Sequence, residues 1–219
     1  MFRESDNSNM RDWMPLFPLQ AVLLPGAELP LHIFEERYKT MIREVLDERI
    51  EFGVVLATEK GLLNTGCTAT IDKLLREYPD GRMDILTTGR RRFEIVRLNE
   101  DRTYLQGSVE FFDDDEASSQ PSPETRQQAI DAYNELQSLS SHSPLASAEA
   151  SDPQLSFRLA RPLTDLGTRQ ALLAMRSEAE RIKQLASFFP AYLIRERRVQ
   201  HLKQVAPRNG HGRALAEIE

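Results

Sequence analysis

The 219-residue sequence has 40% hydrophobic and 28% charged residues and a formal net charge of −6. This composition is typical of a globular protein with one large domain or two small ones, and its acidic balance argues against a surface built to bind nucleic-acid phosphates. The single cysteine, Cys67, excludes an intrachain disulfide and a thiolate metal cage, and fits a reducing compartment.

The N-terminal segment and the apolar runs bear on localisation. Residues 1–12 are polar and mixed in charge, without the apolar core of a secretory signal. No apolar run reaches the ~20 residues that a membrane helix needs. We therefore predict a flexible tail at residues 1–12 and a soluble, cytoplasmic protein that has no contact with membranes.

Residues 13–51 are predicted to form two short strands and a helix. Prolines interrupt the first apolar runs, and because proline removes a backbone donor we expect edge strands at residues 13–17 and 28–31. Between them lies a loop around Pro25 and Gly26. From residue 34 to 46, apolar residues recur at helical spacing, which predicts an amphipathic helix that ends near residues 47–49.

Further strands are predicted up to residue 111. The valine-rich run at 52–57 indicates a strand buried on both faces, and residues 67–72 alternate as a half-buried strand does. A turn at 78–81 precedes strands at 83–88 and 92–98, with Gly89 at a reversal or bulge, and a last strand at 105–111. About six short strands with one early helix predict a strongly bent sheet or a partly open barrel.

The second half of the sequence has a helical period. An acidic run at 113–116 and a Ser- and Pro-rich stretch at 117–123 indicate a linker. Ser122 is predicted to cap a helix, residues 138–151 to form a mobile loop, and Asp152-Pro153 to open a second helix. Residues 168–189 are predicted to be one long helix that Pro190 kinks or ends, with a further helix at 192–205. We thus divide the chain into residues 13–116, residues 117–206 and a flexible tail at 207–219.

Several segments, in this order and spacing, resemble the N-terminal substrate-binding domain of Lon proteases. In residues 13–111 they are PLFPL (15–19), LLPG (23–26), LPLHIFE (29–35), RY (37–38), FGVVL (52–56), GCTATI (66–71), PDGR (79–82) and GRRRFEI (89–95). In the helical part, LSFR (155–158) and RQALL (169–173) are similar to the helical extension of single-domain members of this family.

This resemblance implies an α+β fold with a PUA-like β-rich pseudo-barrel followed by a C-terminal helical bundle. It also implies a role in recognising unfolded or extended polypeptide segments, as an adaptor or regulator of proteolysis or protein quality control, with a protease or chaperone as partner. Full-length Lon adds an ATPase module and a Ser-Lys protease module, but the sequence has no G-x-x-x-x-G-K-[ST] phosphate loop. We therefore predict an ATP-independent binding module that is not an enzyme and needs no cofactor or metal.

The proline-edged strands suggest where a polypeptide would dock. Edge strands expose unpaired backbone groups, and nearby apolar side chains can line a groove beside them. The alternative is that these apolar side chains belong to the core, which is favoured for Phe34 because it continues the helix stripe. The predicted substrate-binding residues are Phe17, Leu24, Pro25, Pro30, Phe34 and Arg37.

Two alternatives from other classes remain. PUA-like folds elsewhere bind RNA, and Arg90, Arg91 and Arg92 are the best hint of such a surface, although successive residues of a strand point to opposite faces. The other alternative is a hydrolase with an unrecognised site, for which the sequence supplies no positioned nucleophile and base. His32 and the other scattered histidines predict no zinc site, and Cys67 is predicted to pack in the core.

Overall fold

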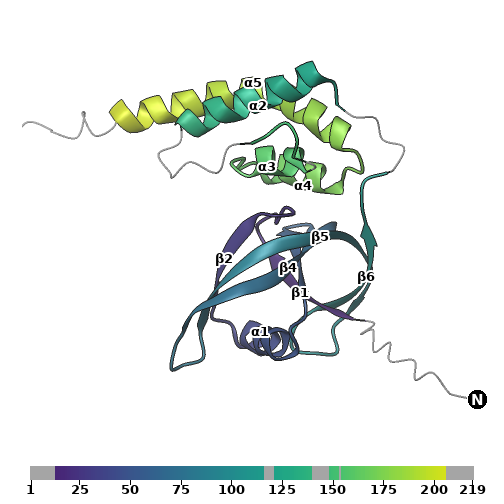
Figure 1. The fold of residues 1–219 in the computed structure, drawn as a ribbon. Helices are drawn as coiled ribbons and strands as arrows, with labels where there is room; N and C mark the ends of the chain where they lie inside the picture. The colour runs from purple at the N-terminus through teal and green to yellow at the C-terminus, as the bar shows by residue number, and fades with distance from the viewer. Residues whose placement is uncertain (1–12, 116–120, 140–147, 153, 206–219) are drawn as a thin grey trace, which may run out of the picture. The chain divides into compact units, whose positions relative to one another are not determined.

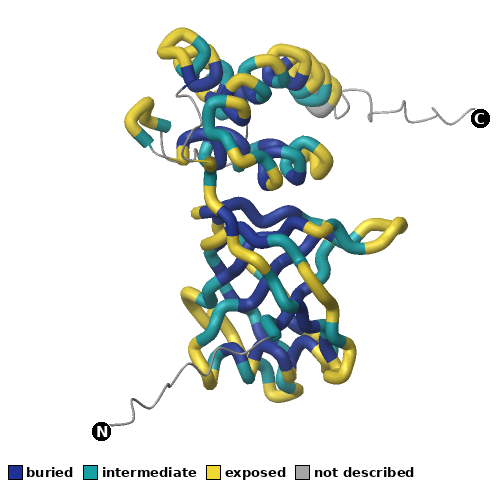
Figure 2. The backbone as a smooth tube through the Cα atoms, turned by 90° about the vertical axis from the view of Figure 1, so that its right-hand side faces the viewer, coloured by how far each residue is buried: buried dark blue, intermediate teal, exposed yellow. Residues whose placement is uncertain are grey.

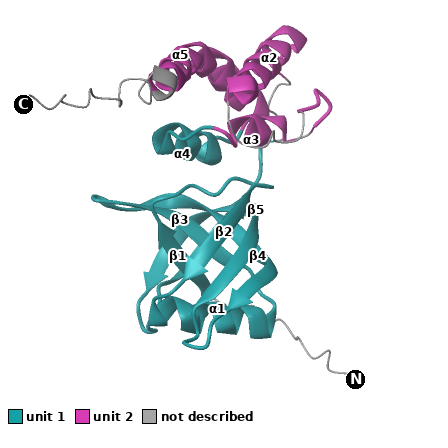
Figure 3. Ribbon diagram, turned by 90° about the vertical axis from the view of Figure 1, so that its left-hand side faces the viewer, with its two compact units in different colours: residues 1–115, 163–176 teal, residues 116–162, 177–219 magenta. Residues whose placement is uncertain are grey.

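The computed structural model describes residues 13–115, 121–139, 148–152 and 154–205 (Figure 1). The chain forms two compact units (Figure 3). The barrel unit comprises Met1–Asp115 and Leu163–Arg176, and the helical unit comprises Glu116–Pro162 and Ser177–Glu219. Within the described residues, no helix is long and apolar enough to cross a membrane. The tails predicted at 1–12 and 207–219 lie outside the described residues.

Six strands make up the sheet of the barrel unit: β1 (Met14–Leu19), β2 (Glu28–Ile33), β3 (Phe52–Thr58), β4 (Gly61–Glu77), β5 (Met83–Asn99) and β6 (Gln106–Phe112). Their order is β2-β5-β4-β3-β1-β6, and β5 also pairs with β6. This last pairing closes β5, β4, β3, β1 and β6 into a ring. The long strand β5 makes the closure possible because its first half pairs with β2 and its second half with β6.

Glycines make room for an aromatic ring inside this barrel. Phe93 is fully buried and packs with Leu16 and Val55. A Cβ atom at Gly66 would lie 2.4 Å from Cζ of Phe93, and one at Gly53 would lie 2.6 Å from the same atom. Real Cβ atoms do not approach so closely, so the small barrel accommodates Phe93 only because both strands carry glycine there.

A helix lies at each end of the barrel (Figures 1 and 3). Helix α1 (Glu36–Glu48) buries one face that includes Tyr38, Met41 and Ile42, and the ring of Tyr38 packs edge-on against Phe17. Helix α4 (Leu166–Ala174) lies at the opposite end and buries Leu172 and Leu173. Although α4 falls in the helical half of the sequence, it belongs to the barrel unit.

The helical unit consists of α2 (Pro123–Leu139), α3 (Leu155–Ala160) and α5 (Glu178–Val205). Oγ of Ser122 accepts a hydrogen bond from the backbone N–H of Thr125 at 3.1 Å, which confirms the predicted cap of α2. The apolar stripes of α2 and α5 pack together, and the burial pattern in Figure 2 follows these stripes. The buried residues are Ala129, Ile130, Tyr133, Leu136, Ile182, Leu185, Phe189, Tyr192 and Leu193.

The predicted element boundaries differ from the structure in three places. The strands predicted at 83–88 and 92–98 are one strand, β5, with a bulge beside Gly89 where the register to β4 shifts. The helix predicted at 168–189 is two helices, α4 and α5, separated at residues 175–177. Pro190 neither ends nor divides α5, which continues to Val205 because burial of the flanking Phe189 and Tyr192 offsets the lost hydrogen bond.

Candidate functional site

Strand β2 is an edge strand that pairs, among the residues that the structure describes, with β5 alone. Together with the β4–β5 hairpin it forms a three-stranded ribbon. The register places His32 opposite Asp84 and Asp84 opposite Arg76, and Pro30 lies opposite Leu86. Directly paired residues share a face, as do residues two apart on one strand. These side chains, with Phe34 and Tyr78, are called the ribbon face below.

A polar and aromatic cluster occupies the ribbon face. Nδ1 of His32 lies 2.5 Å from Oδ1 of Asp84, and the hydroxyl of Tyr78 donates to Oδ2 of the same carboxylate at 2.8 Å. The ring of His32 stacks on that of Phe34 with a centroid distance of 5.9 Å, and meets Tyr78 edge-on. The guanidinium of Arg76 lies over the Tyr78 ring. The cluster thus holds an exposed aromatic surface in a fixed arrangement.

Hydrogen bonding explains the acidity of Asp84. The hydrogen bonds from His32 and then from Tyr78 hold the pKa of the Asp84 carboxyl below its ordinary value of 3.8. A His–Asp pair also occurs in hydrolase triads, where the histidine contacts a nucleophile. Here the described ring neighbours of His32 are Phe34 and Tyr78, so the pair orients aromatic rings.

The structure divides the predicted substrate-binding residues into two groups. Phe17 and Leu24 are 5% and 0% exposed, and Pro25 is buried as well. These three therefore support the core and cannot line a groove. Pro30 is exposed on β2, and Phe34 is 60% exposed. The preference for Phe34 as a core residue was wrong, because α1 begins only at Glu36 and Phe34 lies before its buried stripe.

Arg37 is exposed, but its guanidinium is engaged locally. Its NH2 lies 2.8 Å from Oε2 of Glu35, and the guanidinium stacks over the ring of Tyr38 at 4.5 Å from the centroid. Tyr78, Asp84 and Leu86 were not predicted as neighbours of Pro30 and Phe34. Alternation within residues 83–88 shows that Asp84 and Leu86 share a face, but only the register of β2 on β5 places them beside Pro30 and His32.

The three consecutive arginines do not form a basic patch. Arg90 lies near Asp72, and Arg91 pairs with Glu51 and covers the ring of Phe111. Because each of these two charges lies beside a carboxylate, neither is left for phosphate binding, and the RNA alternative receives no support.

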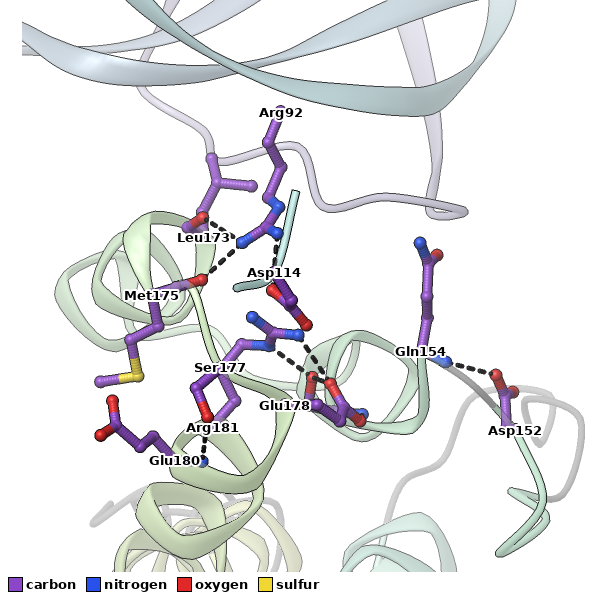
Figure 4. Close-up of polar contacts among 11 residues, drawn as sticks. Arg92, Asp114, Asp152, Gln154, Leu173, Met175, Ser177, Glu178, Glu180 and Arg181 are labelled. Atoms are coloured by element: carbon purple, nitrogen blue, oxygen red, sulfur yellow. Dashed lines mark hydrogen bonds and ion pairs between the residues drawn. The ribbon is translucent and has the colours of Figure 1, made fainter. Parts of the chain in front are cut away.

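Arg92 instead connects β5 to helix α4 (Figure 4). It is 6% exposed, pairs with Asp114 at 2.7 Å, and donates from NH1 to the carbonyls of Leu173 and Met175. These carbonyls lie at the C-terminal end of α4, where helical acceptors lack partners within the helix. Arg92 therefore helps to end α4 at the point where the sequence predicted a continuous helix.

Cys67 is fully buried in β4, as predicted, and burial raises the pKa of its thiol to about 12. A thiol with this pKa carries no thiolate at neutral pH and is no nucleophile. In the described residues, no group of three His, Cys, Asp or Glu side chains is arranged to hold a metal ion.

Comparisons with known proteins agree on one family. The model of the ATP-dependent protease La (LON) substrate-binding domain matches residues 13–189. A 112-residue segment is 34% identical to Lon protease from Parabacteroides distasonis, covering 47% of this chain and 14% of that protein. Lon protease 1 from Hydrogenovibrio crunogenus is 30% identical over 103 residues, which is 43% of this chain and 12% of the protease. The chain thus matches only a small part of each protease, and no catalytic module is evident in that part.

Solved structures agree with this result. The crystal structure of the Lon N-terminal domain protein from Xanthomonas campestris is 27% identical, has a TM-score of 0.65, and covers 80% of this chain and 98% of its own. The N-terminal domain of Mycobacterium avium complex Lon protease, at 18% identity and a TM-score of 0.53, shares the fold. The predicted α+β fold, a six-stranded sheet followed by helices, is confirmed. The chain belongs to the Lon substrate-binding domain family.

Proposed function

We propose that this chain is a non-catalytic cytoplasmic module that binds unfolded or extended segments of other polypeptides, as an adaptor or regulator of proteolysis or protein quality control. The observation that carries this proposal is the match of the substrate-binding domain model over residues 13–189. A protease or chaperone that receives the bound polypeptide is the partner we expect for such an adaptor.

The ribbon face is the surface that we propose for this binding. It combines the edge strand β2 with the exposed ring of Phe34, and a fixed aromatic ring contributes contact area at little cost in side-chain entropy. Pro30 removes one donor from the edge, which disfavours pairing with another sheet and leaves side-chain contacts to dominate.

The test is binding of a permanently unfolded protein, such as reduced and carboxymethylated α-lactalbumin, measured by isothermal titration calorimetry. We expect micromolar affinity for the intact chain and a loss of about fivefold or more in Phe34→Ser, because exposed aromatic anchors contribute strongly to interfaces. Ile194→Ser is the matched control, since Ile194 is 52% exposed on α5 in the helical unit. An intact chain that binds nothing at tens of micromolar, or equal losses in the two variants, would contradict the proposal.

A further inference from the structure

The barrel unit contains a groove of about 770 Å³ beside helix α4. One wall is the β3–β4 hairpin and the other is α4, and every lining residue belongs to the barrel unit. No residue of the ribbon face and no predicted substrate-binding residue lines this groove. Its apolar lining consists of Leu56, Ala57, Leu63, Leu166, Ala171 and Ala174.

The polar groups of the groove favour a ligand that donates hydrogen bonds and carries positive charge. Glu59 is the only charged residue among those that line the groove, is exposed at the hairpin, and has no ion-pair partner among the described residues. Gln170 is 7% exposed, and its Nε2 donates to the backbone carbonyl of Thr65 at 2.9 Å. This bond fixes the orientation of the side-chain amide.

The Oε1 atom of Gln170 accepts no hydrogen bond from any described residue although it is buried. A buried acceptor without a donor is unfavourable, so a ligand N–H that reaches it would gain more than an exposed hydrogen bond does. Gln170 is itself one of the residues that line the groove. The groove thus has one neutral acceptor at its base and one carboxylate at its rim.

The groove also borders an open strand edge. The parallel pairing of β1 with β3 ends at Leu19 and Leu56. Beyond this point, Ala57 and Thr58 pair only with Leu62 and Gly61 of β4 in the described ladders. An extended chain entering the groove can therefore lie along β3 where β1 has ended.

We propose that this groove is a second binding site, for an extended polypeptide segment in which an apolar side chain is followed by a lysine or arginine. The apolar side chain fills the space between Leu63 and Ala174, a backbone N–H donates to Oε1 of Gln170, and the basic side chain pairs with Glu59. This inference rests on the proposed polypeptide-binding function and names the segments that this part of the chain selects.

The experiment uses three short fluorescein-labelled peptides and fluorescence anisotropy with the full chain. All have a Ser-Gly frame. The first carries Leu-Val flanked by lysines and is called the Leu-Val-Lys peptide; the second carries Leu-Val flanked by glutamates, and the third carries the lysines alone. We expect the first to bind about tenfold more tightly than the other two at low salt, because apolar burial and charge pairing both contribute.

Two variants locate the binding. Ala174→Trp fills the groove from an exposed position on α4 and is expected to weaken the Leu-Val-Lys peptide about tenfold. Glu59→Lys is expected to weaken it about threefold at low salt, and less at high salt, because an exposed ion pair is weak and screened. The matched controls are Ala191→Trp on the exposed side of α5 and Glu100→Lys after β5, and both should bind like the unmodified chain.

Nuclear magnetic resonance provides a readout that needs no variant. Titration of the Leu-Val-Lys peptide into the labelled chain should shift backbone signals of residues 57–65 and 166–174 and the side-chain amide of Gln170. Shifts confined to other residues, or equal effects of Ala174→Trp and Ala191→Trp, would overturn the inference. If the chain binds unfolded α-lactalbumin but none of these peptides, the groove proposal fails while the proposed function stands. If the chain binds neither α-lactalbumin nor the peptides, the groove proposal and the proposed function both fail.

Discussion

One fully buried site in the barrel unit differs in kind from one in the helical unit. The barrel is centred on Phe93, a fully buried apolar ring that fits because Gly53 and Gly66 carry no side chain. In the helical unit, the apolar stripes of α2 and α5 are accompanied by a fully buried charge. Arg181 is 1% exposed, and its guanidinium donates to Oε2 of Glu178 at 2.7 Å (Figure 4). It also donates to Oγ of Ser156 at 2.8 Å.

The two sites are stabilised by different interactions. Apolar packing around Phe93 depends on shape and is insensitive to charge. The Arg181–Glu178 pair must recover the free energy lost when both groups leave water, so its value depends on keeping both partners. Glu178 also accepts from the backbone N–H and the hydroxyl of Ser156, and therefore connects α5 to the start of α3.

Two signals distinguish unfolding of the units. Trp13 is the only tryptophan and lies in the barrel unit, so its fluorescence reports on the barrel. Far-ultraviolet circular dichroism reports mainly on the helical unit, which contains the long helices α2 and α5. Urea unfolding followed by both signals shows which unit each of the following substitutions affects.

The largest effect is expected from Phe93→Ala. Removing this ring leaves a cavity in the barrel and should lower the free energy of unfolding, followed by Trp13 fluorescence, by about 4 kcal/mol. Phe111→Ala is the control, because Phe111 lies on the neighbouring strand, paired with Phe93, and is 46% exposed. We expect it to cost about 1 kcal/mol. Equal costs would show that the barrel does not depend on its central ring.

The second effect concerns the buried charge. Arg181→Met leaves the Glu178 carboxylate buried without its partner and should destabilise the helical unit by about 3 kcal/mol, measured by circular dichroism. The double variant Arg181→Met with Glu178→Gln removes both charges and should be more stable than the single one. A double variant that is less stable than Arg181→Met would contradict the interpretation of this interior as an ion pair.

A pair of helix caps tests whether α4 belongs to the barrel unit. Oδ1 of Asp165 accepts from the backbone N–H of Thr168 at 2.7 Å at the start of α4, and Ser122 caps α2. Asp165→Ala and Ser122→Ala should each cost about 1 kcal/mol. We expect the first cost in the Trp13 signal and the second in circular dichroism. The reverse assignment would place α4 with the helical unit.

The smallest change in stability is expected from Tyr104→Phe, and it depends on pH. Burial, followed by the hydrogen bond to Glu44, raises the pKa of this phenol from 10.0 to about 12. Because the pKa is higher in the folded chain, the stabilisation is complete below pH 10 and is lost as pH rises towards about 12. Urea midpoints should therefore fall more steeply above pH 10 in the unmodified chain than in Tyr104→Phe. Parallel pH profiles would show that Tyr104 titrates as an exposed phenol does.

The sequence predicted the elements of the barrel better than the extent of the helices. Alternating and continuous apolar runs predicted the strands around Cys67 and residues 52–57, and the helical stripe predicted α1. The start of α5 carries a local signal that was not used, because Oγ of Ser177 accepts from the backbone N–H of Glu180 at 3.3 Å as an N-cap does. The end of α4 depends on a distant residue instead, since Arg92, about eighty residues away, supplies donors to its last carbonyls. The burial of Phe17 and the exposure of Phe34 likewise depend on where α1 begins.

The candidate site was also predicted only in part, because some of its residues are brought together from distant parts of the chain. Pro30 marked an edge strand because proline cannot donate to a neighbouring strand, and this local property can be read from one residue. The partners of Pro30 and His32 come from β5, and the groove joins residues near 60 with residues near 170.

Local chemistry in the sequence determined the period of each element, the turn and cap residues, and the likeness to the Lon substrate-binding family. The tertiary structure alone decided which strand lies beside which, how β5 closes the barrel, and which polar atoms remain without partners. The physical reason is that periodicity reflects contacts within a few residues, whereas register and closure arise from the packing of segments far apart in the chain.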